Sequence, residues 1–462
     1  SDGWIDLYLG NGGPAMGRRE PDTFYLNDGV GGFIIVIGGE GADDVAVSID
    51  GTITTDAELF FVGEEPELEP VPAVFIGGGE GNVEFGGNAV ITADGGEGLV
   101  VVEAGAGKYG GFDGSYDVIM DADATITASQ GAIGIEASGD VVLGQLSVGS
   151  ADGGESNLVF IGAEGSISSA YSGEITNIST DDGGYVELYA GSGIGSDDEG
   201  YENVITLVAD GGDGTLELGA ETYDGDINVA VSGSLYISND SVEINGFYAS
   251  TDDNITLNVS GDIGLGDVYN YGYGDVTLAA GGTITAAGGE GGNISAYDDV
   301  TLSAVGIGDD EDAINIYGGG GDGASLSLTA SGGEGGEIAV DASESSFDSL
   351  TITLEDADSD VFVNLDSDFV AMSADGVDVT LDGMRTLQSG IDVTINAEAS
   401  DLVLGGKGGT VVNANDSNLT LNASGAISNA NGGVIVFGGE GGSLALSAGD
   451  GIGEDGAVQV YG

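Results

Sequence analysis

The chain has no cysteine and no histidine, and among its 462 residues there are only five prolines and one tryptophan. Without cysteine it can form no disulfides and perform no thiol chemistry. Without histidine it lacks the commonest general base and transition-metal ligand. No run of 18 apolar residues occurs, so no membrane-spanning helix is predicted. These absences exclude the commonest catalytic arrangements and insertion into a bilayer by helices.

Positive charge is also nearly missing, because 80 acidic residues stand against five basic ones and the net charge is −75. A compact chain with this charge repels itself unless cations or salt screen it. We therefore expect dependence on divalent cations, on high ionic strength or on an acidic habitat. The same charge excludes nucleic acid and anionic membranes as partners. The basic residues are Arg18, Arg19, Lys108, Arg385 and Lys407.

What the chain has in abundance is glycine, 91 residues of it, and much of this glycine stands in a repeated tetrapeptide, Gly-Gly-(Glu/Asp)-Gly. Chance at this composition predicts roughly 0.6 copies. Eight copies occur, and several run directly into an alternation of apolar and polar residues, as after Gly78 and Gly438. A glycine turn that feeds a short strand, many times over, is typical of a β-solenoid. The copies start at Gly38, Gly78, Gly95, Gly211, Gly288, Gly320, Gly332 and Gly438.

The repeat is clearest beyond residue 250, where strand-like triplets start at Ile255, Val276, Val300, Leu326 and Leu350. Their spacings of 21, 24, 26 and 24 residues fit one coil of a parallel β-helix. Roughly 20 such coils would fill the chain and give a rod on the order of 100 Å long. No stretch shows a helical apolar period. The sequence therefore predicts an all-β, single-stranded parallel β-helix with almost no α-helix.

A second element, Gly-Ile-Gly, starts at Gly193, Gly306 and Gly451, and a looser copy, Gly-Asp-Ile-Gly, surrounds Ile263. With stretches such as residues 274–285, these repeats resemble the filamentous-haemagglutinin-like family of secreted β-helical proteins. The resemblance covers about residues 110–462 and concerns the style of the repeats alone. It implies a secreted, right-handed β-helix that acts as a shaft, an adhesin or a matrix fibre.

Composition divides the chain into two parts. Residues 1–30 hold the only tryptophan and two of the basic residues, and they lack the glycine–acid turn, which predicts a cap or an inter-subunit arm. Residues 31–462 are predicted to form one continuous solenoid. Within it, residues 64–72 contain three prolines, which predicts a loop projecting from the shaft.

Calcium is the cofactor that the acidic clusters favour, since carboxylates are its preferred ligands. Residues 38–46 match one nonapeptide of calcium-binding β-rolls, but no tandem copy follows. Three aspartates at 356–360 have the opening spacing of an EF-hand loop without its glycine and its final glutamate. A solvated acidic loop is the alternative. The candidate ligands are Asp43, Asp44, Asp197, Asp198, Asp309, Asp310, Asp312, Asp356, Asp358 and Asp360.

Catalysis is not predicted. Paired carboxylates could hydrolyse glycosides, but five scattered basic residues cannot build the cationic groove of a lyase. Thr-x-Thr pairs such as Thr283/Thr285 are scattered, and we interpret them as strand formers rather than an ice-binding face. Asn-x-Ser/Thr sequons offer glycan sites on outward turns. They lie at Asn177, Asn239, Asn254, Asn258, Asn293, Asn415, Asn418 and Asn422.

The resulting hypothesis is a non-enzymatic, extracellular structural protein that stacks head-to-tail with copies of itself. The chain opens at Ser1 without methionine, which we interpret as a mature secreted product. Residues 1–30 would engage a neighbour's C-terminal strand, and such a non-closing contact yields a filament. Alternatives are an adhesin shaft and an S-layer or sheath component joined by calcium. The expected inter-subunit residues are Trp4, Arg18, Arg19, Val458, Val460 and Tyr461.

Overall fold

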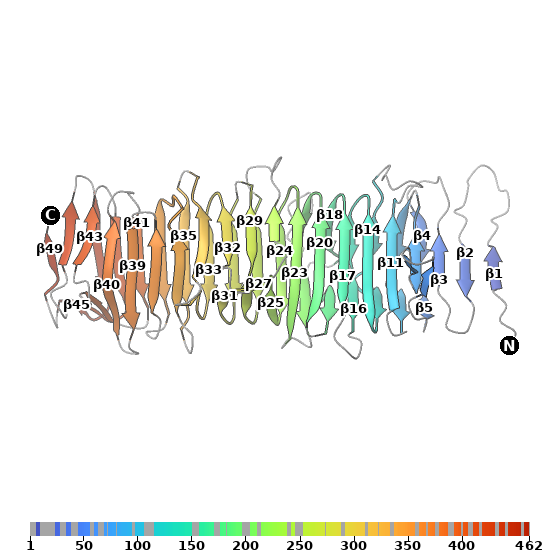
Figure 1. The fold of residues 1–462 in the computed structure, drawn as a ribbon, viewed down its shortest axis with the longest axis horizontal. Coiled ribbons are helices and arrows are strands. Elements are labelled where there is room, and N and C mark those ends of the chain that lie inside the picture. Colours follow the sequence, from blue (N-terminus) through green and yellow to red (C-terminus); the bar gives the residue numbers. More distant parts are fainter. Residues whose placement is uncertain are drawn as a thin grey trace. The chain divides into compact units, whose positions relative to one another are not determined.

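In a computed structural model of the chain, the described residues form 49 strands and no helix (Figure 1). The predicted all-β class is therefore confirmed, and these residues offer no helix of the length and hydropathy needed to cross a membrane. The chain divides into two compact units, Ser1–Leu235 and Tyr236–Gly462. The described residues are 6–9, 24–27, 34–37, 45–55, 60–62, 69–71, 73–79, 81–94, 98–105, 115–149, 157–170, 176–181, 183–195, 204–209, 214–237, 242–244, 253–272, 274–287, 292–309, 313–321, 323–332, 337–355, 360–365, 368–374, 378–386, 392–398, 401–404, 410–414, 418–429, 434–438, 442–453 and 457–461.

The first unit builds two stacked sheets, called A and B here. Sheet A contains β1 (Asp6–Leu9), β2 (Phe24–Asn27), β3 (Ile34–Ile37), β8 (Val74–Gly77), β11 (Gly98–Ala104), β14 (Gly131–Ala137), β17 (Leu158–Ala163), β20 (Gly184–Ala190) and β23 (Thr215–Thr222). Sheet B contains β4 (Val45–Ile49), β5 (Thr52–Thr55), β9 (Asn82–Phe85), β10 (Val90–Ala93), β12 (Val118–Met120), β13 (Thr125–Ala128), β15 (Val141–Leu143), β16 (Gln145–Val148), β18 (Ser166–Ser169), β19 (Ile178–Thr180), β21 (Gly193–Ile194), β22 (Ile205–Ala209) and β24 (Ile227–Ser232). The boundary between the two units falls within strand β25 (Ser234–Tyr236).

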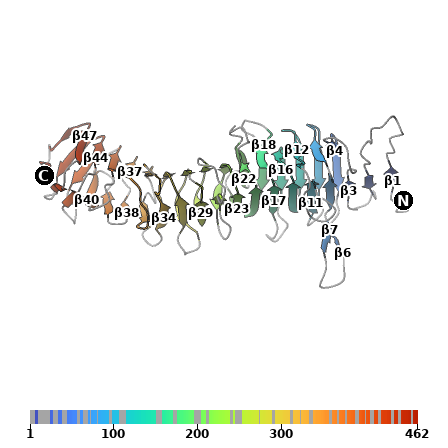
Figure 2. The same ribbon diagram turned by 90° about the horizontal axis from the view of Figure 1, so that it is seen from above.

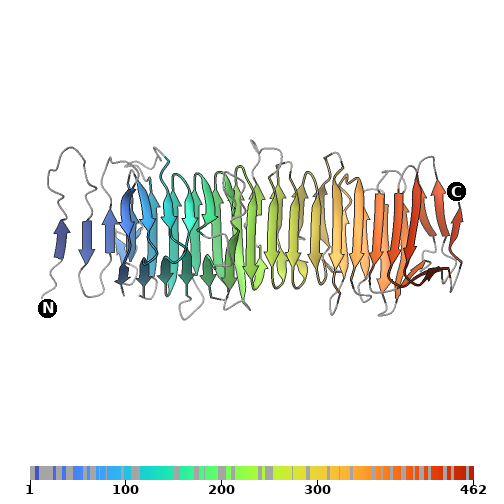
Figure 3. The ribbon, with the colours of Figure 1, turned by 180° about the vertical axis from the view of Figure 1, so that it is seen from behind.

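Each coil of the first unit places one strand in sheet A and two in sheet B. From β9 onward the order along the chain is two B strands and then one A strand, until β24 pairs with both β21 and β22. Each strand pairs parallel with its equivalent one coil later, as β11, β14, β17 and β20 do in succession. Figure 1 labels these strands side by side, and Figure 3 shows the same ribbon from behind. The winding is that of the predicted parallel β-helix.

The core of the first unit consists of aliphatic rows that run across the strands. In sheet A, Ile133, Val159 and Val186 lie in register and are fully buried, because alternate residues of each strand point inward. Strand β11 shows the pattern along its whole length, with buried and half-buried residues alternating. Side chains of valine, isoleucine, leucine and alanine fill most of this interior.

Two parts of the first unit depart from parallel stacking. Strands β1 and β2 pair antiparallel, and β2 pairs antiparallel with β3. Strands β6 (Phe60–Val62) and β7 (Glu69–Val71) form a separate two-stranded antiparallel sheet that stands away from sheets A and B in Figure 2. Pro70 thus lies within a strand rather than in a loop, and a two-stranded sheet tolerates it because both strands are edges.

In most coils of the second unit the division is reversed, with two strands in sheet A and one in sheet B. Sheet A contains β26 (Val242–Ile244), β28 (Ile263–Leu265), β29 (Asp267–Asn270), β31 (Ile284–Ala286), β32 (Asn293–Ala296), β34 (Ile314–Gly318), β36 (Ile338–Ala342), β38 (Val361–Leu365), β39 (Asp368–Ala374), β40 (Asp378–Thr386), β42 (Asp401–Leu404), β43 (Thr410–Ala414), β45 (Ala426–Asn429), β46 (Val434–Gly438), β48 (Gly451–Ile452) and β49 (Gln459–Tyr461). Sheet B contains β27 (Ile255–Val259), β30 (Val276–Ala280), β33 (Val300–Ala304), β35 (Ser325–Ala330), β37 (Ser349–Leu354), β41 (Asp392–Ala397), β44 (Asn418–Ala423) and β47 (Ser443–Ala448).

Sheet B of the second unit confirms the predicted repeat residue by residue. Ile255, Val276, Val300, Leu326 and Leu350 lie in one parallel row. The next strand in the ladder is β41, because three sheet A strands intervene in the sequence. Of these three, β39 lies in the middle and pairs antiparallel with both β38 and β40. The sequence did not predict this antiparallel pairing.

The three clear copies of the Gly-Ile-Gly element have a common structural role. The isoleucines of the first two, Ile194 and Ile307, are fully buried. The glycines that end the three copies, Gly195, Gly308 and Gly453, have φ values of 71°, 69° and 81°, a left-handed turn that other residues resist. The element therefore anchors a coil in the core and turns the chain immediately afterwards.

Candidate functional site

Carboxylates and amides at one corner of the first unit join successive coils. The Oδ1 atom of Asn82 accepts a hydrogen bond from the Asp117 backbone N–H at 2.8 Å. Asp117 Oδ1 accepts one from the Asp140 N–H at 2.8 Å, and Asp140 Oδ1 accepts from the Ser166 N–H at 2.7 Å. Each residue stands at the start of a sheet B strand, so each acid satisfies a backbone donor of the next coil.

The second unit contains the same series of hydrogen bonds from backbone N–H groups to side-chain oxygens of the preceding coil, called the corner ladder here. Asn254 Oδ1 accepts from the Asp275 N–H at 2.9 Å, Asp275 Oδ1 from the Asp299 N–H at 3.0 Å, and Asp299 Oδ1 from the Ser325 N–H at 2.7 Å. Because a carboxylate is a strong acceptor for backbone donors, an acid before each strand is explained by coil stacking. These acids therefore have a structural role, which is to join successive coils.

The predicted calcium ligands are spread along the chain. Asp309 and Asp360 are exposed, and they lie in different coils. In the ranges that the structure describes, no three acidic side chains group as they would around a metal ion. The other candidates, Asp43, Asp44, Asp197, Asp198, Asp310, Asp312, Asp356 and Asp358, lie outside the described residues.

The predicted inter-subunit residues of the last described coil are accessible. Val460 and Tyr461 in β49 are 49% and 55% exposed, and Val458 is half-buried. In the preceding coil the partner of Val460 is Ile435, which is fully buried. Trp4, Arg18 and Arg19 lie outside the described residues.

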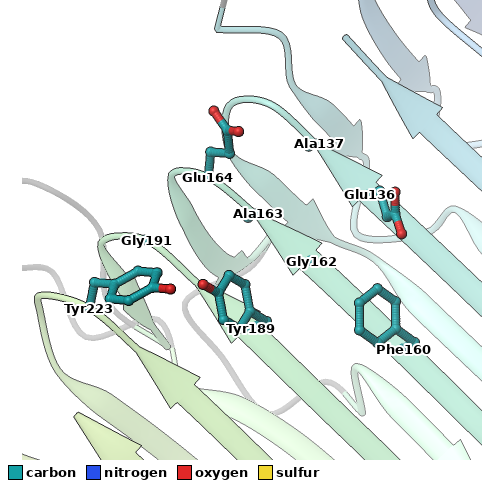
Figure 4. A pocket seen from close by; sticks show the side chains of 9 residues that line it. All are labelled: Glu136, Ala137, Phe160, Gly162, Ala163, Glu164, Tyr189, Gly191 and Tyr223. Atoms are coloured by element: carbon teal, nitrogen blue, oxygen red, sulfur yellow. The ribbon is translucent and has the colours of Figure 1, made fainter. Parts of the chain in front are cut away.

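A groove of about 530 Å³ lies on the outer face of sheet A in the first unit (Figure 4). Aromatic rings and carboxylates line it from different coils, and sequence patterns did not predict it. The rings of Tyr189 and Tyr223 meet edge to face, with centroids 5.6 Å apart and planes at 88°. Burial, followed by the hydrogen bond with Tyr223, raises the pKa of Tyr189, which is therefore a neutral phenol at physiological pH. The lining residues are Glu136, Ala137, Phe160, Gly162, Ala163, Glu164, Tyr189, Gly191 and Tyr223.

A second group of tyrosines lies on sheet A of the second unit. The ring centroids of Tyr269 and Tyr271 are 5.6 Å apart with planes inclined by 31°. Burial, followed by the charge of Asp267, raises the pKa of Tyr269 to about 12. Tyr271 and Tyr317 are exposed, so this face also presents aromatic surface.

The sequence did not predict that single threonines of sheet B form a row across the coils. In the structure one outward row contains Ser327 and the threonines Thr256, Thr277, Thr301, Thr351, Thr394 and Thr420. One interpretation of the sequence needs correction, that of the sequon at Asn177. Asn177 is wholly buried, and its side chain donates to Ser169 Oγ at 3.0 Å and accepts from the Thr206 N–H at 3.0 Å. This sequon therefore cannot carry a glycan in the folded protein.

Comparison of the chain with models of protein families, with curated proteins and with solved structures finds no match.

Proposed function

We propose that the protein is a non-enzymatic, extracellular structural protein whose β-helical units assemble head-to-tail into a filament. The observation that carries this proposal is the state of the last described coil. Ile452 is 48% exposed, whereas its partner one coil earlier, Ile427, is fully buried, and Val460 and Ile435 show the same contrast. Positions that form the core elsewhere face solvent here.

A β-edge of this kind pairs readily with a further strand. We propose that the strand comes from residues 1–30 of a second copy, with Arg18 and Arg19 against its acidic neighbours. A contact between different surfaces does not close on itself, so it yields an open fibre. Calcium would supply the cations that a charge of −75 requires.

Electron microscopy of the purified chain tests the proposal directly. We expect long uniform fibres at low salt with millimolar calcium, and their loss after a chelator is added. Deletion of residues 1–30 should abolish the fibres. Fibres of the same repeat without residues 1–30 would contradict the proposed contact, and single rods under every condition would contradict assembly.

An adhesin shaft is the second candidate, and the β6–β7 hairpin favours it. This hairpin pairs with neither main sheet, as a displayed binding element would. The resemblance of the repeats to haemagglutinin-like secreted proteins supports this role as well. Monomeric rods that bind a surface through residues 60–71 would establish it.

A further inference from the structure

A glycine in the ladder of sheet A, Gly162, lines the groove of the first unit. Glu136, Gly162 and Tyr189 lie in register on the neighbouring strands β14, β17 and β20. Strands in a sheet are about 4.8 Å apart, so Glu136 and Tyr189 are separated by roughly 10 Å. Because Gly162 has no side chain, a slot remains between the carboxylate and the ring.

Aromatic and small side chains form the other walls of this slot. The Phe160 ring lies beside it, since a Cβ added to Gly162 would be 3.5 Å from that ring. Ala137 and Ala163 line the groove, and the edge-to-face contact with Tyr223 fixes the Tyr189 ring. Figure 4 shows the aromatic rings and the two glutamates on neighbouring coils.

Negative charge flanks the slot. Glu221 lies beside Tyr189 in the ladder, and the other carboxylates lie toward Glu136. Glu103 lies directly beside Glu136 in the ladder, and Glu164 lines the groove from the turn after β17. Burial, followed by repulsion from Glu136, raises the pKa of Glu103. Like charges on adjacent strands destabilise a sheet, so a bound cation would relieve this repulsion.

The walls select an organic cation over a metal ion. Ammonium groups are attracted to the faces of aromatic rings as well as to carboxylates. Calcium needs six to eight oxygen ligands, and the Tyr189, Phe160 and alanine walls do not supply them. We propose that this groove binds a small organic ammonium ion between the Glu136 carboxylate and the Tyr189 ring.

The direct test is calorimetric titration of the full chain at low salt with choline and with its neutral isostere, 3,3-dimethylbutan-1-ol. We expect choline to bind at least tenfold more tightly than the isostere, with weaker binding as salt is added. Equal binding of the two compounds would overturn the proposal, because the groove would then recognise apolar shape alone. Displacement of choline by an equal concentration of calcium, or tighter binding of a neutral methyl glycoside, would also overturn it.

Two variants locate the site. Gly162→Val fills the slot and suits a strand, and its Cβ would lie at ordinary contact distances from Phe160 and Glu136. It should abolish choline binding and leave the fold intact. The matched control is Gly134→Val, on the same face one strand away, where a Cβ would meet nothing within 4 Å. Glu136→Gln should weaken binding about threefold to fivefold. Unchanged choline binding in Gly162→Val would place the ligand elsewhere. None of these readouts depends on filament assembly.

Discussion

At the scale of single residues, Glu103 is the clearest titrating group. Its pKa in the folded protein lies above the ordinary 4.5, first because of burial and then because of Glu136. Between pH 4.5 and this raised pKa, the folded state therefore holds a proton that the unfolded state has released. The stability gained from this protonation is lost as the pH rises through the folded pKa. We expect Glu103→Gln to stabilise the protein at neutral pH, with the advantage disappearing toward pH 4.5.

Denaturant unfolding of the wild type and of Glu103→Gln across this range measures the effect. Titration by NMR supplies the control, because Glu136→Gln should lower the pKa of Glu103. An advantage of Glu103→Gln that stays constant with pH would refute the linkage.

The corner ladder predicts a different result for Asp275. Its carboxylate accepts from the Asp299 backbone, and its own N–H donates to Asn254. Asp275→Ala leaves the Asp299 N–H without this acceptor and should cost about 1–2 kcal/mol. Asp275→Asn keeps an acceptor oxygen and should recover most of this loss in urea unfolding. Equal stability of the alanine and asparagine variants would show that the ladder contributes nothing.

At the scale of elements, the Gly-Ile-Gly turn predicts a strict need for its final glycine. Gly308 has a φ of 69°, and a Cβ there would collide with the carbonyl oxygen of Ala339. Gly308→Ala should therefore cost at least about 1–2 kcal/mol. Gly134→Ala, in open space within β14, should be neutral or stabilising. Thermal unfolding compares the two, and a tolerated Gly308→Ala would contradict the left-handed turn.

Sequence patterns predicted the strands and part of their stacking, because local alternation reports which residues face the core. The row of buried residues that starts at Ile255 in sheet B could be predicted directly from the spacing of the repeat. The antiparallel β38–β40 did not, since Val361–Leu365 alternates like any parallel strand and pairing direction depends on distant partners. Sequence patterns could not predict the groove for the same reason. Glu136, Gly162 and Tyr189 come into register only when coils of unequal length are aligned.

At the scale of the whole molecule, charge should dominate the response to solvent. Eighty acids on a chain with five basic residues repel one another in any compact state. Raising sodium chloride from 20 to 500 mM, concentrations chosen to take the Debye length from well above to well below ~10 Å, should increase the melting temperature. Calcium should have the same effect at much lower concentration. Insensitivity to both salts in calorimetry would mean that the folded chain avoids this repulsion.

The unequal coils of the second unit have a mechanical consequence. Each coil contacts only its neighbours, so a force applied along the ladder opens the hydrogen bonds of one coil before it loads the next. The coils from Ile255 to Leu350 contain 21 to 26 residues. Each coil would therefore release about 65–85 Å of extended chain when its hydrogen bonds break. A tether built in this way lengthens in steps under load and absorbs work at every step, which a rigid rod of equal length cannot do.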